Sequence, residues 1–126
     1  MRFIPTRVHG VMDYLMGLLL IASPWLFGFA YGGEETWIPV ILGAGALLYS
    51  IMTDYELGLT KTLSMRTHLT LDLMSGLLLA VSPWLFGFDD LVYGLHLVLG
   101  LTEIVAALTT KRIPSYEKRH HGMAAH

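Results

Sequence analysis

Residues 7–29 read RVHGVMDYLMGLLLIASPWLFGF, and residues 66–88 read RTHLTLDLMSGLLLAVSPWLFGF. The two segments align without a gap at an offset of 59 residues, and fourteen of their 23 positions are identical. Each begins with Arg, His and Asp at matched positions, continues through Gly-Leu-Leu-Leu and ends on Ser-Pro-Trp-Leu-Phe-Gly-Phe. This repetition predicts two copies of one structural unit in the chain.

The apolar residues of the chain are gathered into four runs. Hydrophobic residues make up 54% of the sequence and charged residues 14%, whereas soluble domains carry roughly 25% charged residues. Residues 14–33, 36–53 and 73–88 contain no charge, and residues 91–110 contain only Glu103. A bilayer core of about 30 Å needs about 20 helical residues, and a soluble helix would need a polar stripe that these runs lack. We therefore expect an all-α membrane protein with four transmembrane helices.

The charges are segregated between alternate connections. The basic residues are Arg2, Arg7, Lys61, Arg66, Lys111, Arg112, Lys118 and Arg119. They precede the first run, separate the second from the third, and follow the fourth. The other two connections carry Glu34, Glu35, Asp89 and Asp90, of which Asp89 or Asp90 could cap the fourth helix. Because cytoplasmic loops are enriched in Lys and Arg, we expect both termini in the cytoplasm.

These features divide the chain into two tandem helical hairpins. We expect a first two-helix unit at residues 1–56, a cytoplasmic linker at 57–65, a second two-helix unit at 66–110, and a basic, His-containing cytoplasmic tail at 111–126. An even number of spans in each unit gives both the same orientation, which predicts a pseudo-twofold axis along the membrane normal. We expect the lipid bilayer as the main partner, contact of the tail with anionic lipid, and self-association into a homo-oligomer. No basic face interleaved with aromatic residues suggests nucleic-acid binding.

The repeated Ser-Pro-Trp predicts a helix end at the outer membrane boundary. Pro24 and Pro83 each remove one backbone hydrogen bond, and Ser23 and Ser82 are placed to satisfy the carbonyl that is freed. The flanking aromatic residues Trp25, Phe27, Trp84 and Phe86 are expected in the outer aromatic belt. An interfacial bend with aromatic anchors is favoured over a hinge or the lining of an outer opening.

SPWLFGF at 23–29 and 82–88, each at the end of the first helix of a two-helix unit, resembles the SPW repeat family of small bacterial and archaeal membrane proteins. The resemblance covers residues 7–110. It implies a multi-pass protein of the cytoplasmic membrane with a doubled hairpin. It supplies no established activity and no catalytic residue.

A candidate inner polar network accompanies the repeats. It comprises Arg7, His9, Asp13, Arg66, His68, Asp72 and Glu103. His9 and Asp13, like His68 and Asp72, are four residues apart and share a helical face. The simplest interpretation pairs Asp13 with Arg66 and Asp72 with Arg7, which would lock the hairpins together.

Other interpretations of this network stay open. Intramembrane carboxylates also mark proton and cation paths, and Glu103, which has no counterpart in the first repeat, is the best candidate for such a role. A divalent metal held by the two His and two Asp ranks behind both, so no metal or cofactor is predicted. His96 is expected to make a helix–helix hydrogen bond. The tail residues His120, His121, Met123 and His126 could bind copper or nickel, although a disordered tail with incidental histidines is the simpler interpretation.

Three functions follow from this reading. The first is a non-enzymatic, self-associating membrane component whose polar residues serve packing. The second is a small proton- or cation-coupled transporter or channel that uses the inner carboxylates. The third is a membrane enzyme acting on a lipid or quinone, which ranks last because the sequence shows no recognisable nucleophile, cofactor motif or cysteine. The first is preferred.

Overall fold

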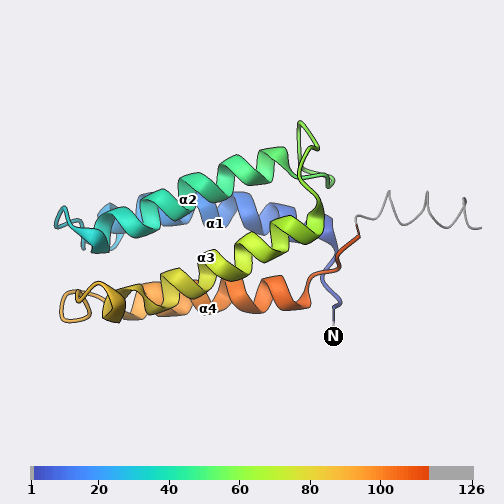
Figure 1. The fold of residues 1–126 in the computed structure, drawn as a ribbon. Coiled ribbons are helices and arrows are strands. Elements are labelled where there is room, and N and C mark those ends of the chain that lie inside the picture. Colours follow the sequence, from blue (N-terminus) through green and yellow to red (C-terminus); the bar gives the residue numbers. More distant parts are fainter. Residues whose placement is uncertain (1, 114–126) are drawn as a thin grey trace, which may run out of the picture.

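The chain folds into two helical hairpins packed side by side (Figure 1). The structure is a computed structural model, and it describes residues 2–113. Its helices are α1 (Thr6–Leu26), α2 (Glu34–Met52), α3 (Met65–Leu85) and α4 (Gly94–Thr109). Helix α1 packs along α2, α3 packs along α4, and α2 also contacts α3. The predicted all-helical architecture with four helices is confirmed.

Three of these helices, α1, α2 and α3, are long and apolar enough to cross a membrane. Helix α4 is equally apolar but has only 16 residues, about 24 Å of helix. It begins later than its apolar run because the backbone first makes a turn, in which the Leu91 amide donates to the Phe88 carbonyl at 2.9 Å. The N-cap of α4 is Tyr93 and has no side-chain hydrogen bond. The expectation that Asp89 or Asp90 caps this helix is therefore wrong.

Glycine pairs allow the two helices of each hairpin to approach closely. In the first hairpin, a Cβ on Gly43 would lie 2.7 Å from the carbonyl oxygen of Gly17. In the second, a Cβ on Gly100 would lie 2.5 Å from the Ala80 amide nitrogen and 2.6 Å from the Gly76 carbonyl oxygen. A side chain at either position would push backbone apart, so glycine is required there.

The outer ends of α1 and α3 have matching geometry. The Ser23 hydroxyl donates to the Leu20 carbonyl at 2.9 Å, and the Ser82 hydroxyl donates to the Leu79 carbonyl at 2.8 Å. These are the carbonyls that Pro24 and Pro83 leave without a backbone donor, so the predicted role of the two serines is confirmed. Gly28 and Gly87 then reverse the chain in the left-handed region, at φ 75° and 74°.

At the opposite end of the bundle lie the segment before α1, the segment after α4 and the connection between the hairpins. Figure 1 shows the N-terminus and the α2–α3 connection at one end and both hairpin turns at the other. The Phe3 amide donates to the Thr109 carbonyl at 2.8 Å, and the Lys111 amide donates to the Ile4 carbonyl at 2.9 Å. The segment before α1 thus lies against the segment after α4. We call this the inner end, and the end with the hairpin turns the outer end.

Candidate functional site

Four ionisable side chains meet near the inner end, between α1 and α3. His9 and Asp13 come from α1, and His68 and Asp72 come from α3. All four are buried, with exposed fractions of 2%, 8%, 0% and 5%. We call these four residues the His–Asp tetrad.

The tetrad is a closed set of contacts within and between the hairpins. Within the helices, His9 Nε2 lies 3.0 Å from Asp13 Oδ1, and His68 Nε2 lies 3.1 Å from Asp72 Oδ2. Across the helices the contacts are shorter: 2.7 Å from His9 Nε2 to Asp72 Oδ2, and 2.8 Å from His68 Nε2 to Asp13 Oδ2. Each histidine therefore contacts both carboxylates through the same nitrogen. The spacing of four residues brought each pair onto one face, and the repetition brought the pairs together.

The other ring nitrogen of each histidine contacts a threonine of the opposite hairpin. His9 Nδ1 lies 2.7 Å from Thr110 Oγ1, and His68 Nδ1 lies 2.7 Å from Thr53 Oγ1. Sequence reasoning missed both threonines. A signal for them exists, because each directly follows the second helix of its hairpin, at equivalent positions 57 residues apart.

Two tyrosines donate to the carboxylates. The Tyr49 hydroxyl, from α2, donates to Asp72 Oδ1, and the Tyr55 hydroxyl donates to Asp13 Oδ2 at 2.9 Å. Tyr55 follows α2 and is fully buried. Burial and the neighbouring Asp13 carboxylate raise the pKa of Tyr55, which keeps its hydroxyl protonated as a donor. No sequence pattern singles out Tyr55, since it belongs to the irregular connection between the hairpins.

The predicted arginine pairs do not form. In residues 2–113, neither Asp13 nor Asp72 has an arginine within ion-pair distance, and their partners are the histidines and tyrosines. Arg7 and Arg66 are exposed. Each arginine precedes the tetrad histidine of its helix by two residues, which places it about 200° around the helix and hence on the opposite face. The expectation of Asp13–Arg66 and Asp72–Arg7 pairs is therefore wrong.

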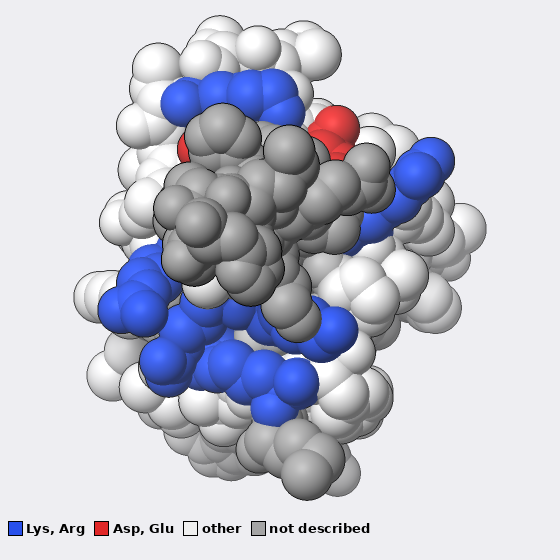
Figure 2. Space-filling model, turned by 90° about the vertical axis from the view of Figure 1, so that its right-hand side faces the viewer, with Lys and Arg blue, Asp and Glu red and all other residues white. Residues whose placement is uncertain are grey.

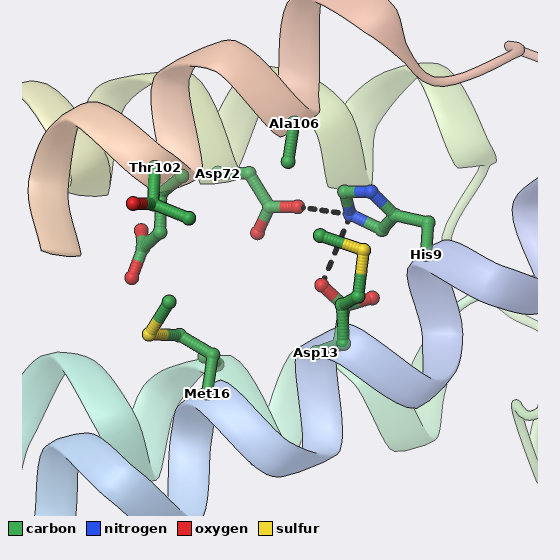
Figure 3. A pocket seen from close by; sticks show the side chains of 9 residues that line it. His9, Asp13, Met16, Asp72, Thr102 and Ala106 are labelled. Atoms are coloured by element: carbon green, nitrogen blue, oxygen red, sulfur yellow. Dashed lines mark hydrogen bonds and ion pairs between the residues drawn. The ribbon is translucent and has the colours of Figure 1, made fainter. Parts of the chain in front are cut away.

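A small cavity adjoins the tetrad on the side of α4 (Figure 3). Its volume is about 30 Å³, enough for about one water molecule. His9, Asp13 and Asp72 line it together with Met16, Thr102, Glu103 and other residues. Glu103 is half-buried and accepts a hydrogen bond of 3.1 Å from the Ser75 hydroxyl. It thus lies beside the tetrad and is not one of its members.

His96 contacts residues of both hairpins, on the side of the tetrad that faces the outer end. Its Nε2 lies 3.0 Å from the Glu35 carbonyl oxygen of the other hairpin, which confirms the expected helix–helix hydrogen bond. The ring lies between Phe29 and Phe88, with centroid distances of 5.2 and 5.1 Å. These are the last residues of the two SPWLFGF segments, so both repeats contact one histidine.

The remaining predicted residues lie apart from the tetrad. Ser23, Pro24, Ser82 and Pro83 are buried at the outer ends of α1 and α3. Trp25, Phe27, Trp84 and Phe86 are exposed there, as interfacial anchors would be. The tail histidines at 120, 121 and 126 lie outside the described residues.

Comparisons with known proteins give one match. Searches of curated proteins and of solved structures found no match to this chain. The model of the SPW repeat domain matches residues 7–110, a range that includes both SPWLFGF segments, the tetrad and all of the four helices except Thr6. The chain therefore belongs to the SPW repeat family.

Proposed function

We propose that this protein is a non-enzymatic integral membrane component in which the His–Asp tetrad fastens two duplicated hairpins together. The observation that carries the proposal is the burial of four ionisable groups that contact one another across α1 and α3. Such groups are costly in a bilayer unless they are paired. Here every tetrad carboxylate has histidine contacts from both hairpins and a tyrosine donor.

The proposed topology has four spans and both termini in the cytoplasm. Helix α4 is short for a span, but Leu91, Val92 and Tyr93 precede it, and local thinning or flanking residues accommodate such a mismatch. Lys and Arg gather at the inner end (Figure 2), where Arg2, Arg66, Lys111 and Arg112 lie together. This distribution supports an inner end that faces the cytoplasm of a bacterial or archaeal cell, with the tail against anionic lipid.

A pseudo-twofold axis along the membrane normal is part of the proposal. The exchange of matched contacts supports it: His9 reaches Thr110 while His68 reaches Thr53, and each histidine reaches the carboxylate of the other helix. Paired glycine crossings and paired Ser-Pro turns within the hairpins add to this support. A gene duplication of the hairpin accounts for all of them.

Self-association is the further element of this proposal. The interior of a single chain is small and is occupied by the tetrad, whereas the outward faces carry large apolar side chains such as Leu15, Ile41 and Met74. These faces suit lipid and a second copy alike. The oligomeric state is measured by cross-linking in native membranes and by light scattering of the detergent-solubilised protein. A monomer under both conditions would show that self-association is wrong.

The fastening role is tested by removing one carboxylate charge inside the tetrad or outside it. We expect Asp13→Asn and Asp72→Asn to lower the unfolding midpoint in detergent, and the double variant to separate the hairpins in cysteine cross-linking across α1 and α3. Asp89→Asn, at an exposed outer turn, is the matched control and should behave as wild type. If both tetrad variants keep wild-type stability, the fastening role is wrong.

A proton- or cation-coupled pathway is the second candidate, and the water-sized cavity beside Glu103 favours it. In such a pathway, Glu103→Gln would abolish cation or proton flux in liposomes and leave the fold intact. If the tetrad only fastens the hairpins, liposomes that contain the wild-type protein show no more proton or cation flux than liposomes without protein. A membrane enzyme is the third candidate, and a quinone or lipid retained at one per chain through purification would favour it over both others.

A further inference from the structure

The inward-facing atoms of the tetrad form a compact set of donors. One ligand atom from each of His9, Asp13, His68 and Asp72 lies within 4.8 Å of every other. The four nitrogen–oxygen contacts measure 2.7 to 3.1 Å, whereas tetrahedral zinc with bonds of about 2.0 Å spaces its ligand atoms roughly 3.3 Å apart. These contacts are shorter than the spacing around a zinc ion, so an ion at the centre would require the four side chains to move apart.

The threonines fix the tautomer of both histidines. Thr110 Oγ1 donates its only proton to the Ala106 carbonyl at 2.6 Å, and Thr53 Oγ1 donates its own to the Tyr49 carbonyl at 2.6 Å. Each hydroxyl oxygen can therefore only accept from the histidine Nδ1. With Nδ1 protonated, a neutral ring leaves an unprotonated Nε2 beside the carboxylates. Metal-bound histidines have this arrangement, with one nitrogen on the metal and the other donating to a fixed acceptor.

In residues 2–113, His68 Nε2 is one of three buried side-chain polar atoms without a hydrogen-bond partner, with Ser50 Oγ and His96 Nδ1, and it is the one that belongs to the tetrad. It is fully buried and lies 2.8 and 3.1 Å from two carboxylate oxygens. Neither oxygen lies in the direction of a hydrogen bond from this nitrogen. A buried polar atom without a hydrogen bond requires a cause, and a cation between Nε2 and the carboxylates supplies one.

The charge of the tetrad suits a divalent partner. Metal binding through Nε2 requires both rings to be neutral, and Asp13 and Asp72 then leave two negative charges in the bundle, where within residues 2–113 neither has a Lys or Arg within ion-pair distance. Tyr49 and Tyr55 hold the carboxylates in place but do not neutralise them. One divalent cation balances both charges.

We propose that His9, Asp13, His68 and Asp72 bind one divalent transition-metal ion, with zinc as the best fit to two imidazole nitrogens and two carboxylate oxygens. Thr53, Thr110, Tyr49 and Tyr55 orient these ligands. The adjoining cavity, with room for about one water, supplies space for a fifth ligand. The ion joins the two hairpins directly, since each contributes one imidazole and one carboxylate.

The test measures metal bound to the full-length protein in detergent. His120→Ala/His121→Ala/His126→Ala serves as the background, so that the tail histidines contribute nothing. After chelation and equilibrium dialysis against Zn²⁺, we expect mass spectrometry to find one zinc ion per chain. Cobalt in place of zinc should give the intense visible absorption of a four- or five-coordinate site. His68→Ala and Asp72→Asn should weaken binding at least tenfold, by loss of a ligand.

Two further variants keep the test decisive. His96→Ala removes a buried histidine that contacts Glu35 and lies outside the tetrad, and it should retain one ion per chain. Thr53→Val removes the acceptor of His68 Nδ1 and a donor to the Tyr49 carbonyl, but no metal ligand. It should weaken binding about ten- to a hundredfold and shift the cobalt bands, which keeps the test informative where ligand variants fail to fold. A background protein that binds no ion, or a Thr53→Val protein with unchanged affinity and spectrum, overturns the proposal, and the histidines then carry the compensating protons.

Discussion

The two hairpins are nearly alike in their first helices and different in their second. Helices α1 and α3 make the same tetrad contacts, glycine crossings and Ser-Pro turns. In the second helices, Ala106 of α4 stands at the position of Tyr49 in α2, and Glu103 stands at the position of Ala46. The tetrad residues of the first helices are thus retained, whereas the residues beside them in the second helices have diverged.

This divergence explains the asymmetry of the site. Tyr49 fills the space beside Asp72 on the α2 side, whereas the small Ala106 leaves the water-sized cavity on the α4 side. Asp13, which lacks a tyrosine from α4, receives its hydroxyl from Tyr55 in the connection instead. Two different elements therefore supply equivalent donors, which indicates that a donor to each carboxylate matters more than its origin.

Removal of one tetrad carboxylate should have the largest effect on stability. Asp13→Ala and Asp72→Ala each take away a carboxylate that two buried histidines and one tyrosine contact, and removing one partner of a buried ionic contact costs about 3–5 kcal/mol. The two variants should lose equal stability if the hairpins contribute equally. Reversible unfolding in mixed detergent micelles, followed by circular dichroism, measures both. A loss below about 1 kcal/mol in either would show that its carboxylate is dispensable.

Crowding of the glycine crossings should have the next largest effect. Gly43→Ala and Gly100→Ala each place a methyl group against backbone atoms of the partner helix, and overpacking costs about 1–3 kcal/mol. Gly100→Ala should be the worse of the two, because its Cβ meets the Ala80 nitrogen at 2.5 Å as well as the Gly76 oxygen. The same unfolding measurement compares them.

The matched control for this pair is Gly45→Ala. Gly45 lies on α2 two residues beyond Gly43, and a Cβ there would have nothing within 4 Å. Its free energy of unfolding should stay at the wild-type value or rise slightly, since alanine favours the helix. A loss as large as that of Gly43→Ala would mean that a second chain covers this face.

Loss of the tyrosine donors should cost less. Tyr49→Phe and Tyr55→Phe each remove one hydroxyl from a buried carboxylate, and we expect about 1–2 kcal/mol from each. Similar losses would support equivalent roles for the two tyrosines despite their different origins. If only Tyr55→Phe is destabilised, the hydroxyl that the connection supplies to Asp13 contributes more stability than the hydroxyl that α2 supplies to Asp72. The thermal unfolding midpoint distinguishes these outcomes. It is followed with a fluorescent dye that does not react with thiols, since the chain has no cysteine.

Much of the fold could be predicted from the sequence because a bilayer limits the backbone structures that can cross it. Uncharged runs of sufficient length, alternating basic connections and the offset of 59 residues were enough to predict four helices in two hairpins. The short α4 was not predicted, because the turn at residues 89–93 depends on backbone geometry after Phe88 and not on hydropathy.

The candidate site could be predicted from the sequence only in part. Spacing by four residues identified His9–Asp13 and His68–Asp72 as pairs, but it did not show that each histidine would contact the carboxylate of the other helix. Helical phase alone could have excluded the arginines, since a residue two positions away faces the other side. Tyr55 could not have been found, because its place depends on how the connection folds back over the tetrad.

The smallest expected effect concerns the Ser-Pro turns, where the hairpins are most alike. Ser23→Ala and Ser82→Ala each remove the hydroxyl that satisfies a carbonyl left free by proline. Hydrogen bonds within membranes average about 0.6 kcal/mol, so each variant should lose about that much and the two losses should be equal. The double variant should show their sum, because the two turns belong to separate hairpins and share no partner. A loss confined to one serine would show that the outer ends of the hairpins, despite identical sequence and geometry, sit in different surroundings.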